Sequence, residues 1–410
     1  MKLLYKVLLL VLVYLLIYKP EFIFFPSSIN TCLGLLGFMS YFFDRITRTA
    51  IYNNANISVL NIIKYAIPFT LVAIFSVLLN GTNDFYYVKY ILSLVLAYFA
   101  NYLIAVVSYK CYGTYDIKIF IRYLVLATWI YLLVAFAMSI NGSLNNALLS
   151  LLKKDENQEA VLELTFGGRL HALGASYFTA GIICGYVFIL VSYNILRNSY
   201  TLVQLLYYYV FLIVLFVIGM MLARTTLVGS LIGCSMIVVS LLRSKSKVFK
   251  TVIISLIIIG IIIITLGINV SSDLKNQLQN LSDFAFEMFI NYNETGTFST
   301  SSTNHLQTMY DAIPNSDWTW IIGDAQWGTT SEYYKGTDVG YLRSIWYFGL
   351  LGLFALIYYY YNVLHEVFDN RGFHRTLVYI LFLYVLILNG KGSCDLFFYV
   401  IPIYFCRIKT

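Results

Sequence analysis

Long apolar runs separated by short polar connectors make up most of the chain. Runs of roughly 17–25 apolar residues allow a helix to cross the hydrocarbon core of a bilayer, which is about 30 Å thick. We therefore predict an all-α, polytopic membrane protein with about 12 transmembrane helices. The expected spans are 3–18, 22–43, 62–79, 86–107, 119–139, 171–195, 204–222, 226–242, 251–269, 345–363, 376–389 and 394–406.

The first apolar run, 3–18, has the basic flank of a signal peptide. No small-residue cleavage site follows it, because Lys-Pro-Glu comes instead at 19–21. We therefore expect an uncleaved first span. No repeat of fixed period occurs, and Pro and Gly are too sparse to mark a linker. The chain 1–410 is thus expected to form a single transmembrane domain.

One apolar run is too long for a single crossing. Residues 205–242 contain one charge, Arg224, and as one helix they would extend about 57 Å at about 1.5 Å per residue. The run must therefore reverse direction, and Arg224 marks the reversal. An arginine at such a turn can simply snorkel to the interface. It can also bind an anion, because its planar fork matches phosphate and carboxylate groups.

The basic residues determine the orientation. Only 11% of the chain is charged and 60% is hydrophobic. With the N-terminus in the cytoplasm, 17 of the 27 Lys and Arg fall inside against four of the 20 acids, and the remaining 10 fall outside with 16 acids. This distribution follows the positive-inside rule and predicts cytoplasmic termini. The net charge of +7 then reflects topology and requires no nucleic-acid partner.

This orientation places three arginines on the outer side: Arg169, Arg224 and Arg343. Two polar loops, 140–170 and 270–344, lie on the same side. The second loop is rich in tryptophan and tyrosine and is too long for a simple connector. Its segment 305–313 has apolar residues at helical spacing. We expect a short amphipathic helix there, on the membrane surface or over the mouth of the bundle.

Several kinds of chemistry are not indicated. There is no P-loop and no Gly-x-Gly-x-x-Gly after a strand, and the outer loops lack the Asp-x-Asp that would bind the metal of a nucleotide sugar. The six cysteines are scattered, and neither they nor the four histidines pair at metal-ligand spacing. We therefore expect no cofactor and no metal. No acid lies near the middle of a span, which disfavours an ion-coupled transporter.

Three segments resemble the O-antigen polymerase (Wzy) family, within the O-antigen polymerase and ligase group of bacterial membrane glycosyltransferases. The segment FGGRLHALG at 166–174 is similar to the family's arginine and glycine segment before a span. ARTTLVGSLIG at 223–233 is similar to its Ser-Arg-Thr-type turn. DVGYLRSIWYFGLLGLF at 338–354 carries a Tyr-Leu and a Gly-Leu-Leu-Gly like those of the family's most recognisable stretch. Together they cover less than a tenth of the chain.

The resemblance implies an all-helical fold of the GT-C type at the periplasmic face of the bacterial inner membrane. Such a polymerase transfers a growing glycan from undecaprenyl pyrophosphate onto a lipid-linked repeat unit, without metal or nucleotide sugar. The product is the O-antigen of lipopolysaccharide or a capsular or exopolysaccharide. The implied partners are the lipid-linked donor and acceptor glycans and membrane lipid, with a chain-length regulator as an optional further partner.

The resemblance also suggests roles for individual residues. Arg169, Arg224 and Arg343 match the outward arginines expected to hold the pyrophosphate. Asp338 and His305 are the two alternatives for a base that takes the proton of the attacking sugar hydroxyl. Ligases commonly have a histidine before the Tyr-Leu, in the region where this chain has Asp338, and this favours the polymerase. Family members often carry an arginine at the start of the loop helix, where this chain has His305.

Three alternatives remain at this point. The O-antigen ligase is the nearest, and it shares the family pattern. A polysaccharide or lipid flippase would carry charged residues at mid-membrane depth, which the spans lack. A non-catalytic membrane scaffold or receptor would explain aromatic loops but gives no reason for converging arginines.

Overall fold

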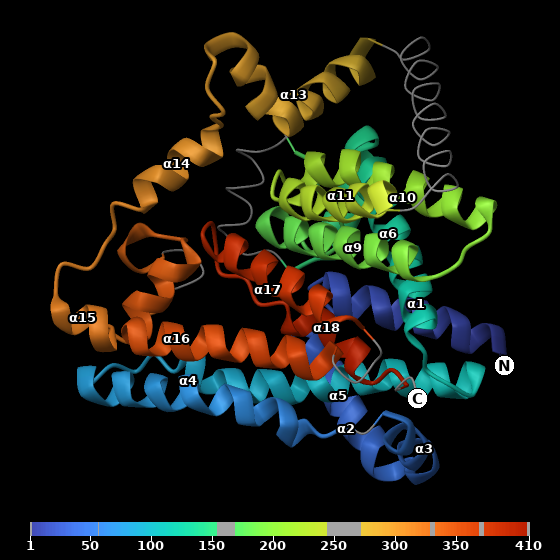
Figure 1. Ribbon diagram of the computed structural model, residues 1–410, viewed down its shortest axis with the longest axis horizontal. Coiled ribbons are helices and arrows are strands. Elements are labelled where there is room, and N and C mark those ends of the chain that lie inside the picture. Colours follow the sequence, from blue (N-terminus) through green and yellow to red (C-terminus); the bar gives the residue numbers. More distant parts are fainter. Residues whose placement is uncertain are drawn as a thin grey trace. The chain divides into compact units, whose positions relative to one another are not determined.

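The computed structural model describes residues 2–55, 57–153, 169–243, 272–328, 333–368 and 373–407. Within these ranges it contains sixteen α-helices, one 3₁₀ turn and two isolated β-bridges (Figure 1). The all-α prediction is therefore confirmed for the part of the chain that is described. The chain forms two compact units, one with residues 1–19, 25–123 and 301–410, the other with residues 20–24 and 124–300. That the chain is a single transmembrane domain stays a prediction.

The first unit contains three long helices that lie side by side: α4 (Val59–Asn80), α5 (Tyr86–Tyr112) and α16 (Gly340–Phe368) (Figure 1). Helices α1 and α2 also pack against α5. The remaining elements of this unit are α1 (Lys2–Tyr18), α2 (Ile29–Phe43), α3 (Arg45–Ala55), α14 (Ser301–Met309), α15 (Asp317–Ile322), η1 (Tyr334–Gly336), α17 (Arg375–Asn389) and α18 (Phe397–Tyr404).

The second unit is centred on α9 (Tyr177–Arg197), which is buried along most of its length and packs against α10 (Leu202–Leu222) and α11 (Thr226–Arg243). Helix α13 (Ser272–Thr295) packs on α10. A short helix, α7 (Gly142–Leu149), lies in the predicted loop 140–170. Helix α6 (Ile117–Ile140) belongs to the first unit up to Tyr123 and to the second beyond it.

Among the described residues, six helices are long and apolar enough to cross a membrane: α4, α5, α6, α9, α10 and α16. Shorter apolar helices are α2, residues 226–239 of α11, and α17. These helices support a multi-pass membrane protein. The expected span 251–269 lies outside the described residues.

Several expected segments differ in extent from the helices observed. The spans expected at 22–43 and 171–195 contain helices that begin only at Ile29 and Tyr177, because residues 22–28 and 171–176 form non-helical connectors. The span expected at 394–406 contains α18, which has only eight residues and begins at Phe397. Residues 394–396 therefore belong to the connector that precedes it. The helix expected at 305–313 corresponds to α14, which begins at Ser301 and ends at Met309. Its Leu306 and Met309 pack against apolar residues at the start of α16.

Glycines allow the closest helix contacts in each unit. A Cβ atom added to Gly37 of α2 would lie 1.9 Å from the carbonyl oxygen of Phe99 in α5. A Cβ atom added to Gly229 of α11 would lie 2.2 Å from the Cα atom of Gly185 in α9. Small residues at such crossings let helix backbones approach closely within a membrane. The contact of α11 with α9 fixes the position of the turn that precedes α11.

Helix α16 is kinked at Phe348 and Gly349. The backbone angles of Gly349, φ 68° and ψ −169°, belong to a region that is essentially restricted to glycine. A Cβ atom at this position would lie 2.2 Å from the carbonyl carbon of Ile321 in α15. Helix α15 therefore packs directly against the kink, with no room for a side chain between them.

The segment that follows α15 is hydrogen-bonded to the backbone at the kink. The carbonyl of Trp346 accepts a hydrogen bond from the N–H of Asp324 at 2.7 Å, and the carbonyl of Tyr347 accepts one from Ala325 at 2.9 Å. The hydroxyl of Ser76 in α4 donates to the same Tyr347 carbonyl at 2.9 Å. Backbone groups of α16 are thus satisfied from outside the helix, as buried polar groups must be.

The charge distribution leads to a first prediction about topology. Reporters fused at Ser302, in α14, and at Ser246, outside the described residues, should lie on opposite sides of the membrane. A phosphatase that is active only outside the cytoplasm should be active at Ser302 and inactive at Ser246, whereas a cytoplasmic reporter should give the reverse. If both positions reported the cytoplasm, the outward placement of the arginines would be wrong.

Candidate functional site

Arg224 occupies the short turn between α10 and α11. The apolar run 205–242 therefore reverses at the predicted residue, since α10 ends at Leu222 and α11 begins at Thr226. The hydroxyl of Thr226 donates to the carbonyl of Gly219 at 2.9 Å, and the N–H of Ala223 donates to the same carbonyl at 2.8 Å. These bonds hold the backbone on each side of Arg224.

Arg169 is brought next to this turn from the segment before α9. The N–H of Leu170 donates to the carbonyl of Met221 at 3.1 Å, which ties this segment to the end of α10. The guanidinium carbons of Arg169 and Arg224 each lie 4.4 Å from the ring centroid of Phe284. The two carbons are therefore at most twice that distance, 8.8 Å, apart. This separation falls within the roughly 10 Å that binding to one diphosphate requires.

The two guanidinium groups influence each other electrostatically. Burial lowers the pKa of Arg224, and the charge of Arg169 lowers it further, to about 10. Burial also lowers the pKa of Arg169. A pKa of about 10 leaves Arg224 charged at neutral pH, so like charges lie close together in a partly desolvated place. Such an arrangement favours a bound anion.

Glu287 of α13 forms an ion pair with Arg224. It lies three residues after Phe284, so the carboxylate and the ring come from the same face of α13. Among the described residues, no carboxylate lies within 4 Å of Arg169.

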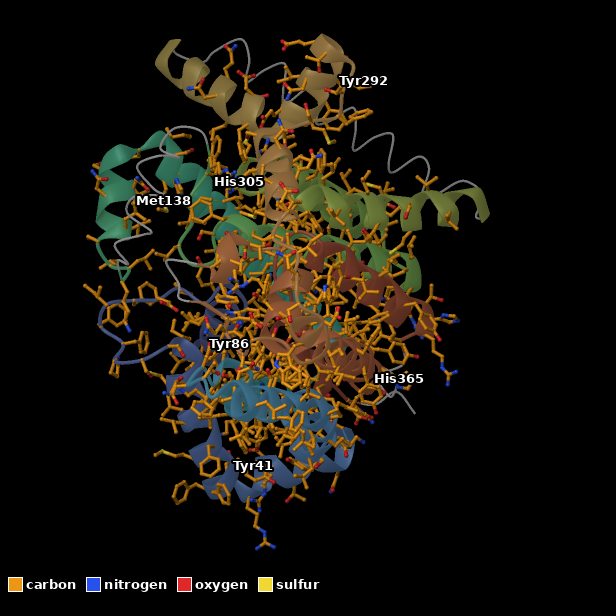
Figure 2. All side chains as sticks on the ribbon, turned by 90° about the vertical axis from the view of Figure 1, so that its left-hand side faces the viewer. Tyr41, Tyr86, Met138, Tyr292, His305 and His365 are labelled. Carbon is orange, nitrogen blue, oxygen red and sulfur yellow. The ribbon has the colours of Figure 1, made fainter. Side chains whose placement is uncertain are left out.

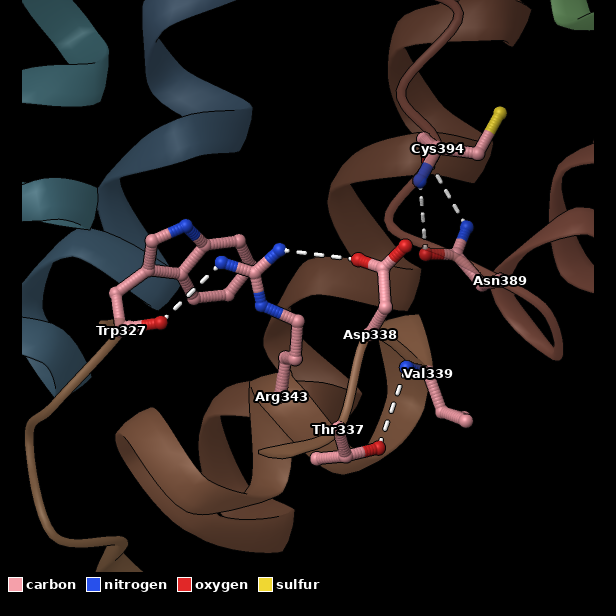
Figure 3. A network of polar contacts seen from close by, with 7 residues as sticks. All are labelled: Trp327, Thr337, Asp338, Val339, Arg343, Asn389 and Cys394. Carbon is pink, nitrogen blue, oxygen red and sulfur yellow. Dashed lines mark hydrogen bonds and ion pairs between the residues drawn. The ribbon is translucent and has the colours of Figure 1, made fainter. Parts of the chain in front are cut away.

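Arg343 lies in the first unit, near the start of α16, and is only 8% exposed. Its Nη1 donates to Asp338 Oδ1 at 3.3 Å, and its Nη2 donates to the carbonyl of Trp327 at 3.2 Å (Figure 3). Its guanidinium carbon lies 3.8 Å from the ring centroid of Trp327 and 4.6 Å from that of Tyr333. The proximity of Asp338 to Arg343, which their short separation in the sequence predicts, is confirmed. That Arg343 shares one diphosphate with Arg169 and Arg224 stays a prediction.

The two candidate bases have different surroundings. Burial raises the pKa of Asp338, whereas Arg343 and Lys391 act to lower it. Because Asp338 is bound to Arg343, one of its oxygens is already used. His305 lies on the exposed face of α14 (Figure 2). The role of a base stays a prediction for both residues.

The position of Trp327 is fixed by an acid that was not among the predicted site residues. Asp84, in the connector between α4 and α5, accepts a hydrogen bond from the N–H of Trp327 at 2.7 Å. Its backbone carbonyl accepts from the hydroxyl of Tyr347 at 2.6 Å. The ring of Tyr86 stacks on Trp327 with a centroid distance of 4.3 Å. Trp327 therefore lies between Tyr86 and Arg343 and supports the guanidinium group of Arg343. Trp327 is only 7% exposed.

A second pair of charges in the first unit was also missed. Burial raises the pKa of Asp395, in the connector before α18, to about 7, although the N–H of Phe397 and the charge of Lys19 favour the carboxylate. Burial lowers the pKa of Lys19 to about 8, opposed by Asp395. The ammonium of Lys19 lies 4.4 Å from the ring centroid of Phe398. Each of the two residues borders an apolar run, so the sequence pattern indicates the end of a span there and not a partner for a distant charge.

No family model matches the chain, and no match was found among curated proteins or among solved structures. Within the described ranges, no group of three or more His, Cys, Asp or Glu is placed to hold a metal ion. The pair of guanidinium groups in the second unit is therefore the main structural indication of a function.

Proposed function

We propose that the protein polymerises undecaprenyl-pyrophosphate-linked oligosaccharide repeat units at the periplasmic face of the bacterial inner membrane. It would act as a metal-independent glycosyltransferase, similar to the O-antigen polymerase (Wzy) family, with about 12 transmembrane helices in a GT-C-like arrangement. The observation that carries this proposal is the position of Arg169 and Arg224 beside the ring of Phe284. Two guanidinium groups side by side suit a lipid-linked diphosphate, because their planar forks match phosphate oxygens.

The proposed reaction explains why fixed cations would be useful. The hydroxyl oxygen of the acceptor sugar attacks the anomeric carbon of the donor glycan, and the bond from that carbon to the diphosphate oxygen breaks. The diphosphate leaves with the electron pair, and the hydroxyl proton passes to a base. Negative charge therefore grows on the leaving group in the transition state. Preorganised guanidinium groups stabilise this charge without reorganisation.

Asp338 and His305 remain the two proposed bases. The good leaving group reduces the demand on the base. Arg343, bound to Asp338, is proposed as a further diphosphate-binding group that the substrate would have to share with this acid. Lipid-linked donor and acceptor, membrane lipid and a chain-length regulator are the partners that this function implies.

The O-antigen ligase is the second candidate. It would use the same leaving group and the same arginines, but it would transfer a finished polymer to a lipid acceptor. The aspartate at 338, in the region where ligases commonly carry a histidine, favours the polymerase. A flippase is the third candidate and lacks a comparable argument.

The polysaccharide profile of a strain that lacks the gene tests this function. For a polymerase, the ladder of long chains should collapse to a single capped repeat unit. For a ligase, capping should disappear and lipid-linked polymer should accumulate. An unchanged ladder would contradict both assignments. Restoring the gene on a plasmid is the control, and it should return the ladder to its original length.

A further inference from the structure

One face of α13 covers the two arginines of the second unit. Phe284 contacts both guanidinium groups, and Glu287 is paired with Arg224. Leu281 and Ala285, on the same side of the helix, are buried. The apolar part of this face thus holds α13 in place, while its ring and its carboxylate point to the guanidinium groups.

Building on the proposed function, we infer that α13 is the cover of the diphosphate site. Glu287 is an internal occupant that a diphosphate must displace from Arg224. Phe284 is a positioning residue that holds both guanidinium groups whether or not Glu287 is in place.

The chemistry of Glu287 fits an internal occupant. A guanidinium binds carboxylate and phosphate oxygens with the same geometry, so Glu287 and a diphosphate compete for Arg224. The side chain of Glu287 is 25% exposed, whereas that of Arg224 is 10% exposed. The carboxylate can therefore move toward solvent while the guanidinium stays in place. The carboxylate of Glu287 carries one negative charge, whereas a diphosphate carries enough charge for both arginines.

Phe284 has the complementary property. An aromatic face attracts a guanidinium, and the attraction is stronger where the cation is desolvated. A ring that contacts two cations offsets part of their mutual repulsion. Because the ring has no oxygen or nitrogen acceptor, it does not compete with the diphosphate for the hydrogen bonds of the guanidinium groups. It therefore keeps the arginines close together for the ligand.

The test is the binding of inorganic pyrophosphate to the purified full chain, measured by calorimetry. Glu287→Gln removes the competing charge and keeps the shape, so pyrophosphate should bind about tenfold more tightly. Phe284→Leu keeps an apolar side chain but removes the aromatic face, so pyrophosphate should bind about tenfold more weakly. Glu294→Gln, at an exposed acid of the same helix, is the matched control and should leave binding unchanged.

A purely structural role for α13 makes a different prediction. Both substitutions would then loosen the helix, and pyrophosphate binding would weaken or stay the same in each. Unchanged or weaker binding in Glu287→Gln would overturn the proposal. Hydrogen exchange in the wild-type chain gives an independent measurement if a variant fails to fold. Pyrophosphate should speed the exchange of amides at 281–295, and slower or unchanged exchange would contradict displacement of Glu287.

These binding experiments are separate from the test of the polymerase. Inorganic pyrophosphate contains no sugar, so the affinity shifts do not depend on the glycan. Opposite shifts of pyrophosphate affinity in the two variants, together with an unchanged ladder in the strain that lacks the gene, would refute the polymerase and support the cover. Loss of the ladder in the strain that lacks the gene, with no affinity shift in either variant, would support the polymerase and refute the cover.

Discussion

Replacing Arg224 by alanine should reduce polymerisation by about 10²–10³-fold, because removing one preorganised donor to a developing oxyanion typically has this effect. The turn itself is held by Thr226 and Ala223 through Gly219, so the variant should accumulate in the membrane at a near-normal amount. The measurement is the length distribution of the polysaccharide in a strain that lacks its own copy of the gene, together with the amount of membrane protein. Full activity in Arg224→Ala would identify the residue as a snorkelling anchor.

Arg224→Lys should retain little activity. A lysine keeps the charge, but it cannot make two parallel hydrogen bonds to a phosphate group. Activity close to wild type in this variant would indicate that only the charge matters.

Glu287→Gln is the control for a purely structural ion pair. If Arg224 served mainly to hold α13 through Glu287, the glutamine variant would lose about as much activity as Arg224→Ala. If Arg224 binds the diphosphate, polymer should still form in Glu287→Gln. A structural ion pair and a diphosphate-binding arginine thus predict opposite activities for Glu287→Gln.

Gly349→Ala should greatly reduce the amount of folded protein. The backbone region of Gly349 is strained for alanine by about 1–3 kcal/mol, and the new Cβ atom would lie 2.2 Å from the backbone of Ile321. Together these effects should lower the free energy of unfolding by at least about 3 kcal/mol. The measurement is the yield of monodisperse protein after detergent extraction and its thermal midpoint.

A matched glycine is available as a control for Gly349. Gly142, at the start of α7, has no atom within 4 Å of an added Cβ and does not require a positive φ. Gly142→Ala should therefore leave the yield and the thermal midpoint close to wild type. Equal behaviour of Gly142→Ala and Gly349→Ala would show that the kink of α16 adapts to a side chain.

The sequence predicts those features that depend on one segment at a time. The length of the apolar run 205–242 requires a reversal, and its single charge marks where the reversal lies. The four-residue connection between Asp338 and Arg343 at the start of a helix similarly predicts their contact. Hydrophobicity and spacing are sufficient in both cases, because the partners are neighbours in the chain.

Contacts between distant segments could not be predicted in this way. Phe284 and Glu287 are about 60 residues from Arg224, in a helix whose polar residues resemble those of an ordinary surface helix. Only the packing of α13 on α10 brings them to the turn. Lys19 and Asp395 stand at opposite ends of the sequence, each beside an apolar run. A hydropathy pattern therefore treats them as boundaries of spans, although the fold makes them influence each other.

The hydrogen bonds from Asp324 and Ala325 to the kink of α16 have a consequence for engineering. Large extramembrane loops are natural units to exchange when chimeras are built to alter substrate choice, and their helices are usually left unchanged. Here the segment after α15 supplies donors to carbonyls inside α16, so a transplanted loop would leave these carbonyls unsatisfied unless it carried matching backbone geometry. Viable exchanges should therefore have their junctions before α15 and after Gly352, moving the loop and the first half of α16 as one module.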